Sequence, residues 1–229
     1  MENVLFEDMV SNTYGVVAIR YGIQRSNITL VNISFINTVS ERGPAITYFS
    51  GNPIWGALFM HIQNCSFINN YGVYGGAIDY SNSEGLHINI VDSLFLGNLA
   101  GIPNVGGFGG AIYAADQSAF MIIKNTRFDS NSASSRGGAI CSDALTNITI
   151  INSTFFNNTA FHGGHLHFMP PISITYQRQD SGISEDITKV LQIYGSIRRW
   201  IGNNRWRICE DWKRADWDLD KCNSEGKIS

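Results

Sequence analysis

Three aspartates follow copies of a Gly-Gly-Ala-Ile sequence, at Asp79, Asp116 and Asp143. Carboxylates that converge on one face, usually with Arg or Lys, are what a polysaccharide-cleaving enzyme needs for general acid and base steps or for binding calcium. These three lie one, four and three residues after the signature Ile, so no two share a column of the repeat. We expect them to be separate turn or surface residues, and we predict no catalytic site and no cofactor. An enzyme remains the alternative hypothesis.

A second candidate is the sequence HGGHLH, which contains His162, His165 and His167. Two of these histidines lie two residues apart on an expected strand and could supply two ligands to zinc or copper. No carboxylate or Cys neighbours them in the sequence. The other interpretation is a polar outer strand face, and the sequence predicts no metal site.

The four cysteines do not form an obvious framework. Cys65 and Cys141 occupy different points of the repeat, so we expect them to lie apart. Cys209 and Cys222 are close enough in the chain to close a small loop, which leaves a disulfide or two free thiols as alternatives.

The elements that carry these residues come from an internal repeat. Seven-residue segments such as NCSFINN and NSTFFNN align on a central Phe, and successive Phe residues are 32, 28, 33 and 27 residues apart. The aligned phenylalanines are Phe35, Phe67, Phe95, Phe128 and Phe155. Further along each copy comes the glycine signature, for example at residues 75–78 and 109–112. This period is typical of a solenoid coil.

Apolar residues alternate with others before the Phe and after the glycines, which indicates strands. The separation from the polar residue at the start of each segment to the Phe is three, so the chain must turn a corner there, with one residue in the left-handed region. Stacked coils then place like residues on one another, and we expect a buried ladder of hydrogen-bonded side chains. Its members are Asn32, Asn64, Asp92, Asn125 and Asn152. The predicted fold is all-β, a right-handed parallel β-helix of about six coils.

The combination of GGA[ILV] with FxxN resembles the repeat of chlamydial polymorphic outer membrane proteins. The resemblance covers about residues 26–168, and three copies in the middle match both halves of the motif. Pro44, Thr38 and the pair His165 and Leu166 depart from it. The resemblance implies a pectin-lyase-like β-helix in a secreted or surface-displayed, adhesin-like protein.

The composition changes after Pro170 and Pro171, and the last 58 residues hold 19 of the 35 charged residues. We therefore divide the chain into repeats at residues 1–168 and a C-terminal segment at 169–229. Apolar residues from Ile187 to Ile201 recur at helical spacing, which predicts a helix that caps the solenoid. The rival interpretation is an unrelated tail.

Charge and hydropathy exclude some functions. A net charge of -3 without a basic stripe argues against nucleic-acid binding. No apolar run reaches the roughly 18 residues of a membrane-spanning helix, and no signal peptide precedes the first coil. We therefore expect a piece of a longer exported protein, located outside the cell or on its surface, and associated with the outer membrane in a bacterium. The expected function is a non-catalytic, adhesin-like or structural module whose partners are host-cell or extracellular glycan or protein surfaces.

Overall fold

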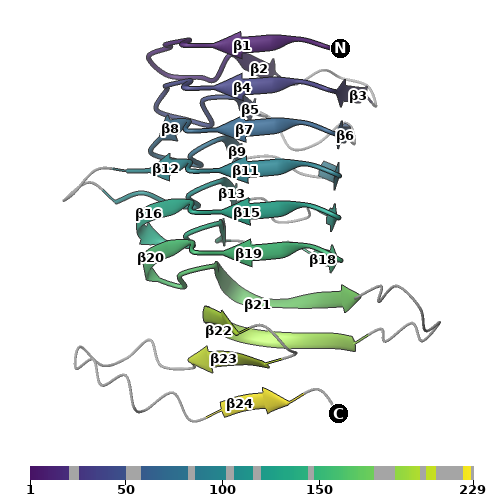
Figure 1. Cartoon of the computed structure of the whole chain (residues 1–229), viewed down its shortest axis with the longest axis vertical. Coiled ribbons are helices and arrows are strands. Elements are labelled where there is room, and N and C mark those ends of the chain that lie inside the picture. Colours follow the sequence, from purple (N-terminus) through teal and green to yellow (C-terminus); the bar gives the residue numbers. More distant parts are fainter. Residues whose placement is uncertain are drawn as a thin grey trace.

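The computed structural model describes residues 1–20, 26–49, 58–81, 86–101, 106–115, 120–143, 147–177, 189–201, 205–209 and 224–227. Every regular element in these ranges is a β-strand, and the strands stack along the long axis of the molecule from the N-terminus downward (Figure 1). Within the same ranges, no helix has the length and apolar character needed to cross a membrane.

The strands of the coils form four parallel ladders, and the third ladder begins only in the third coil. The first ladder comprises β3 (Ser26–Val31), β6 (Leu58–Gln63), β10 (Leu86–Val91), β14 (Phe120–Lys124) and β18 (Asn147–Ile151). The second comprises β1 (Leu5–Glu7), β4 (Ser34–Ile36), β7 (Ser66–Ile68), β11 (Leu94–Leu96), β15 (Arg127–Asp129) and β19 (Thr154–Phe156). The third comprises β8 (Tyr71–Gly72), β12 (Leu99–Ala100), β16 (Ser132–Arg136) and β20 (Thr159–His162). The fourth comprises β2 (Val17–Arg20), β5 (Ile46–Phe49), β9 (Ile78–Ser81), β13 (Ile112–Ala115) and β17 (Ile140–Ser142).

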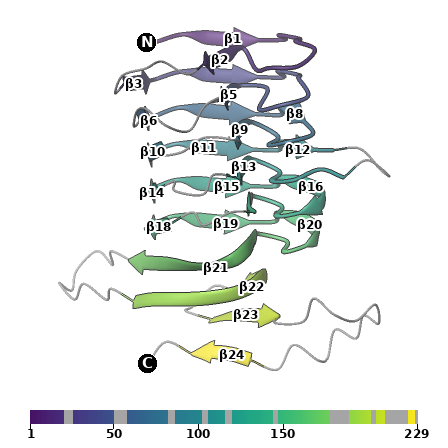
Figure 2. The same cartoon turned by 180° about the vertical axis from the view of Figure 1, so that it is seen from behind.

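The architecture is a parallel β-solenoid. The chain passes through the ladders in turn, for example from β6 through β7 and β8 to β9, and then begins the next coil with β10. The second ladder is a six-stranded sheet, so five full turns separate β1 from β19 (Figure 2). The sequence predicted about six coils, and the sixth continues beyond β19 into β20 and β21 (Leu166–Gln177). The solenoid itself is confirmed.

The predicted Phe column is a continuous stack inside the solenoid. Adjacent rings from Phe35 to Phe155 have centroids 4.5–5.2 Å apart and lie nearly parallel. Phe6 in β1 extends the stack, with its ring centroid 5.0 Å from that of Phe35. The stacked rings therefore help to fix the register between adjacent coils.

The corner before each Phe is left-handed, as predicted. Residues Asn32, Asn64, Asp92, Asn125 and Asn152 have φ between 44° and 54°. Their side chains do form a ladder along the stack, for example from Asn64 Nδ2 to Asn32 Oδ1 at 2.7 Å and from Asn152 Nδ2 to Asn125 Oδ1 at 2.9 Å. The prediction that this ladder is buried is wrong, because the left-handed residue points its side chain out of the coil, and all five are exposed.

The buried amide ladder lies on the other side of the Phe. Asn70, Asn98, Asn131 and Asn158 each follow the Phe by three residues and are nearly or fully buried. The Nδ2 of Asn98 donates to Asn131 Oδ1 at 2.8 Å and to the Phe67 carbonyl at 2.9 Å. The Oδ1 of Asn98 accepts from the backbone and side-chain nitrogens of Asn70 at 3.1 and 2.9 Å. Every polar atom of this side chain is thus satisfied without water.

The paired glycines are required by close approach of neighbouring coils. The first glycine has positive φ, as at Gly109 (65°). The second faces the next coil, and a Cβ on Gly110 would lie 2.0 Å from the carbonyl oxygen of Gly138. No side chain fits between the two backbones there.

The C-terminal segment departs from the prediction. The structure has β21 (Leu166–Gln177), β22 (Lys189–Ile201), β23 (Arg205–Cys209) and β24 (Ser224–Lys227). The predicted helix is wrong over Lys189–Ile201, because β22 pairs antiparallel with the edge that β21 leaves open. Short apolar runs rich in β-branched residues fit strand and helix alike, so their periodicity could not decide. Since Cys222 lies outside the described residues, the Cys209–Cys222 disulfide stays a prediction, as does the division at residue 168.

The two ladders predict different costs for removing an amide. Asn98→Ala leaves several buried groups without partners, and we expect the free energy of unfolding to fall by about 3 kcal/mol or more. Asn125→Gly removes an exposed amide while allowing the left-handed φ, and should cost less than about 1 kcal/mol. Urea unfolding followed by circular dichroism measures both. Equal losses would contradict the assignment of the buried ladder.

The glycine contacts predict a second pair of outcomes. Gly110→Ala pushes a methyl group into the backbone of the next coil and should lower the free energy of unfolding by about 3 kcal/mol or more. Gly106→Ala is the matched control, because its Cβ would meet nothing closer than 3.6 Å. It should change stability by less than about 0.5 kcal/mol. Thermal melting of both variants is the measurement, and a tolerated Gly110→Ala would contradict the coil spacing.

Candidate functional site

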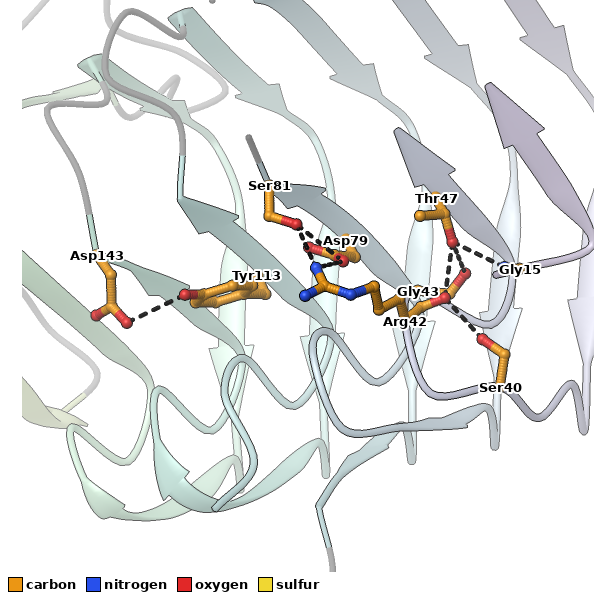
Figure 3. Close-up of polar contacts among 9 residues, drawn as sticks. All are labelled: Gly15, Ser40, Arg42, Gly43, Thr47, Asp79, Ser81, Tyr113 and Asp143. Carbon is orange, nitrogen blue, oxygen red and sulfur yellow. Dashed lines mark hydrogen bonds and ion pairs between the residues drawn. The ribbon is translucent and has the colours of Figure 1, made fainter. Parts of the chain in front are cut away.

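One column of the fourth ladder carries chemically varied side chains, which we call the polar row. It contains the residue after the signature Ile in each coil, and the strands pair these residues directly. Its members are Thr47, Asp79, Tyr113, Cys141 and His167. Figure 3 shows the part of this row around Asp79 and Tyr113. Neighbouring coils thus place five different functional groups side by side.

A second set of side chains, the covering row, packs over the polar row. It contains the residue before the first glycine of each coil, and bridges join Arg42 to Tyr74, Tyr74 to Phe108 and Phe108 to Arg136. The Arg42 guanidinium lies 4.6 Å from the Tyr74 ring centroid. The rings of Tyr74 and Phe108 lie 5.6 and 5.7 Å from that of Tyr113. The covering row therefore shields the polar row from solvent.

Asp79 is the most unusual group in the polar row. Its side chain is fully buried, and its Oδ2 accepts hydrogen bonds from Arg42 at 3.1 Å and from Ser81 at 3.1 Å (Figure 3). Its Oδ1 is buried without a hydrogen-bond partner among the described residues. Burial raises the pKa of Asp79 to about 7, against the opposing charge of Arg42. The carboxyl is therefore protonated in a large fraction of molecules near neutral pH.

The second carboxylate, Asp143, belongs to a separate cluster. Its Oδ2 accepts from the Tyr113 hydroxyl at 3.3 Å, and its Oδ1 lies 3.6 Å from Arg136. Burial is the main cause that raises the pKa of Tyr113, and the negative charge of Asp143 is the second. The same two causes, in the same order, raise the pKa of the Cys141 thiol. Both groups are thus held in their neutral, protonated forms, which are poor nucleophiles.

The aspartates suggested by the sequence are not brought together as a pair. Asp79 and Asp143 occupy different columns, as predicted, and each has its own arginine. Asp116 lies outside the described residues. Asp79 is inaccessible to a substrate in this arrangement, since its side chain has no exposed surface. The expectation of a turn or surface residue is therefore wrong for Asp79, which lies inside β9 and is buried.

The three histidines are placed in two environments. His165 takes the position that Ala139 has in the previous coil and is buried. His167 lies in the polar row, with its ring centroid 6.5 Å from that of His162. The expectation of a polar outer face is wrong for His165 and His167, since both are buried, and burial lowers the pKa of His167 to about 4. Among the described residues no group of three His, Cys, Asp or Glu side chains is placed to hold a metal ion.

Two signals in the sequence could have located both rows. The polar row always follows the signature Ile, and the covering row always precedes the first glycine. The residue types at these positions change from coil to coil, so a repeat defined by shared residues does not include them.

A different surface exposes aromatic rings. On the outer side of β6, β10 and β14, the rings of Phe59, His87 and Phe120 stack with centroids 4.7 and 5.0 Å apart. Phe59 and Phe120 are 41% and 47% exposed. We call these three residues the ring ladder. This gathering of exposed rings on one face is a candidate contact surface.

The buried carboxyl predicts a pH dependence of stability. Because the pKa of Asp79 is raised in the folded protein, folding favours its protonated form, and the free energy of unfolding falls as the pH rises from about 4 to 7. The total change is on the order of 4 kcal/mol, and stability from this group is then level above about pH 7. Asp79→Asn should abolish this slope, whereas the exposed Asp8→Asn should retain it. The measurement is the midpoint of urea unfolding for each variant between pH 4 and 8. If stability depends on pH equally in Asp79→Asn and in the unchanged chain, the raised pKa of Asp79 is contradicted.

Comparison with known proteins supports the repeat. Residues 92–115 and 125–143 match the Chlamydia polymorphic membrane protein repeat. A stretch of 136 residues is 33% identical to the probable outer membrane protein PmpE of Chlamydia trachomatis serovar D. The aligned stretch covers 54% of this chain and 14% of the length of PmpE. No solved structure matches the chain. The chain therefore carries repeats of the Chlamydia polymorphic membrane protein type and is a distant homologue of PmpE.

Proposed function

We propose that this chain is a non-catalytic, adhesin-like module that is displayed on a cell surface and binds an extracellular partner. The observation that carries the proposal is the ring ladder, an exposed strip of stacked rings on the outer side of a rigid solenoid. Aromatic side chains are enriched at surfaces that recognise other molecules. The homologue is named a probable outer membrane protein, which supports a location at the cell surface.

The state of the polar row supports binding over catalysis. General acid and base catalysis needs a titrating group within hydrogen-bond reach of the substrate. Asp79 is instead buried beneath Arg42, and Asp143 is held by Tyr113 and Arg136. These contacts suit a structural role in joining the coils.

The handedness of the coil belongs to the same proposal. Parallel strands of one sheet are joined by crossover connections, and such connections are right-handed in about 98% of cases. We infer a right-handed solenoid on this ground, which agrees with the resemblance to pectin-lyase-like helices.

Adhesion of coated beads tests the proposed function. Latex beads that carry the full chain should bind cultured epithelial cells several-fold more than beads coated with the heat-unfolded chain, because binding requires the folded surface. Equal binding of the two bead types would count against the proposal. So would cleavage of a polysaccharide by the purified chain, measured as new reducing ends, if Asp143→Asn abolished it.

A further inference from the structure

The outward face of the first ladder combines two neighbouring columns of different chemistry. One is the ring ladder. The other runs through His61 and Asn89, where Asn89 Nδ2 lies 3.2 Å from His61 Nδ1 and His61 Nε2 lies 3.3 Å from Gln63 Oε1. Aromatic surface and amide or imidazole groups thus lie side by side over β6 and β10.

The same face is almost free of charge. None of β3, β6, β10, β14 and β18 contains Asp or Glu, although the chain has 19 acidic residues, and Lys124 is their one charged residue. Depletion of charge together with exposed aromatic rings is typical of the centre of a binding surface. The complementary ligand is therefore uncharged.

The orientation of the rings restricts the ligand further. Neighbouring rings are parallel within 11° and 6°, so they cover one another's faces and present their edges to solvent. The edge of an aromatic ring carries partial positive charge and suits oxygen acceptors. The amide and imidazole groups of the second column also hydrogen-bond to oxygen. An oxygen-rich, uncharged ligand fits both columns.

The strand pairing of the first ladder also excludes the binding of a peptide as an added β-strand. β6 pairs with β3 and β10, and β10 pairs with β6 and β14, so their backbone edges are already occupied. A peptide cannot join this face as an added strand. Coils repeat about every 4.8 Å along the axis, which is close to the advance per sugar of an extended β-linked glycan.

We propose that the ring ladder and the adjoining His61 and Asn89 bind an uncharged, extended β-linked glycan chain that lies along the solenoid axis. This inference deepens the proposed function and rests on it. β6 and β10 each offer one ring and one hydrogen-bonding side chain to successive sugars, and β14 extends the surface with the Phe120 ring beside the exposed Ile122.

Calorimetric titration of the full chain with cellohexaose and with chitohexaose tests the inference. At least one of them should bind, and Phe59→Ser combined with Phe120→Ser should weaken that binding about tenfold or more. Phe156→Ser is the matched control, because it removes another exposed Phe from the second ladder, and it should leave affinity unchanged. The circular dichroism spectrum and thermal melt of the double variant should match those of the unchanged chain, which separates lost binding from misfolding.

Several results would overturn the inference. Failure of both hexasaccharides to bind, or binding that survives the double substitution in a folded protein, would do so. Binding of a heparin hexasaccharide in their place, lost in Lys124→Ala, would assign the face to an anionic ligand. If the coated beads still adhere to cells in any of these cases, the proposed function stands and only the glycan assignment falls. If neither beads nor hexasaccharides bind, both fall.

Discussion

The buried Asn ladder is the interaction on which the rest of this solenoid depends. The corner after each Phe turns polar backbone and amide groups inward, where water cannot reach them. Asn98 shows the solution, since its amide bonds to the next coil, to the previous coil and to the Phe67 carbonyl at once. This arrangement works only if successive coils have the same height and register. As a consequence, the phenylalanine rings of adjacent coils stack with their centroids 4.5–5.2 Å apart.

The close approach of the backbones at the paired glycines is the second constraint. Together with the buried Asn ladder, it allows few residue types at the inward positions of the coil. The positions that point away from the Phe stack vary more, whether the covering row buries them or they are exposed. The polar row holds a hydroxyl, a carboxyl, a phenol, a thiol and an imidazole on five adjacent strands without disturbing the core. The ring ladder likewise occupies outward positions of the first ladder. Architecture and chemistry are therefore encoded at separate positions of one repeat, which allows surfaces to change while the fold is kept.

The features that repeat could be predicted from sequence, and those that vary could not. The Phe column, the strand alternation and the left-handed corner each recur in every copy, so their geometry follows from spacing alone. The burial of Asn70 and the exposure of Asn64 did not follow, because both columns are nearly invariant and only the sign of φ decides which side chain points inward. The covering of Asp79 by Arg42 joins residues 37 positions apart, at positions of the repeat whose residue types change from coil to coil. In β22, the open edge of β21 outweighed a periodicity that also fits a helix.

The direction of the hydrogen bonds between coils has a mechanical consequence. Because the strands stack along the long axis, these bonds point along it as well (Figure 1). A force that pulls the two ends of the solenoid apart acts along these hydrogen bonds. It breaks the bonds of one coil at a time and does not shear a whole sheet at once. Each coil that yields releases 27 to 33 residues, which is about 100 Å of extended chain. The solenoid is therefore stiff at rest and can lengthen stepwise under tension.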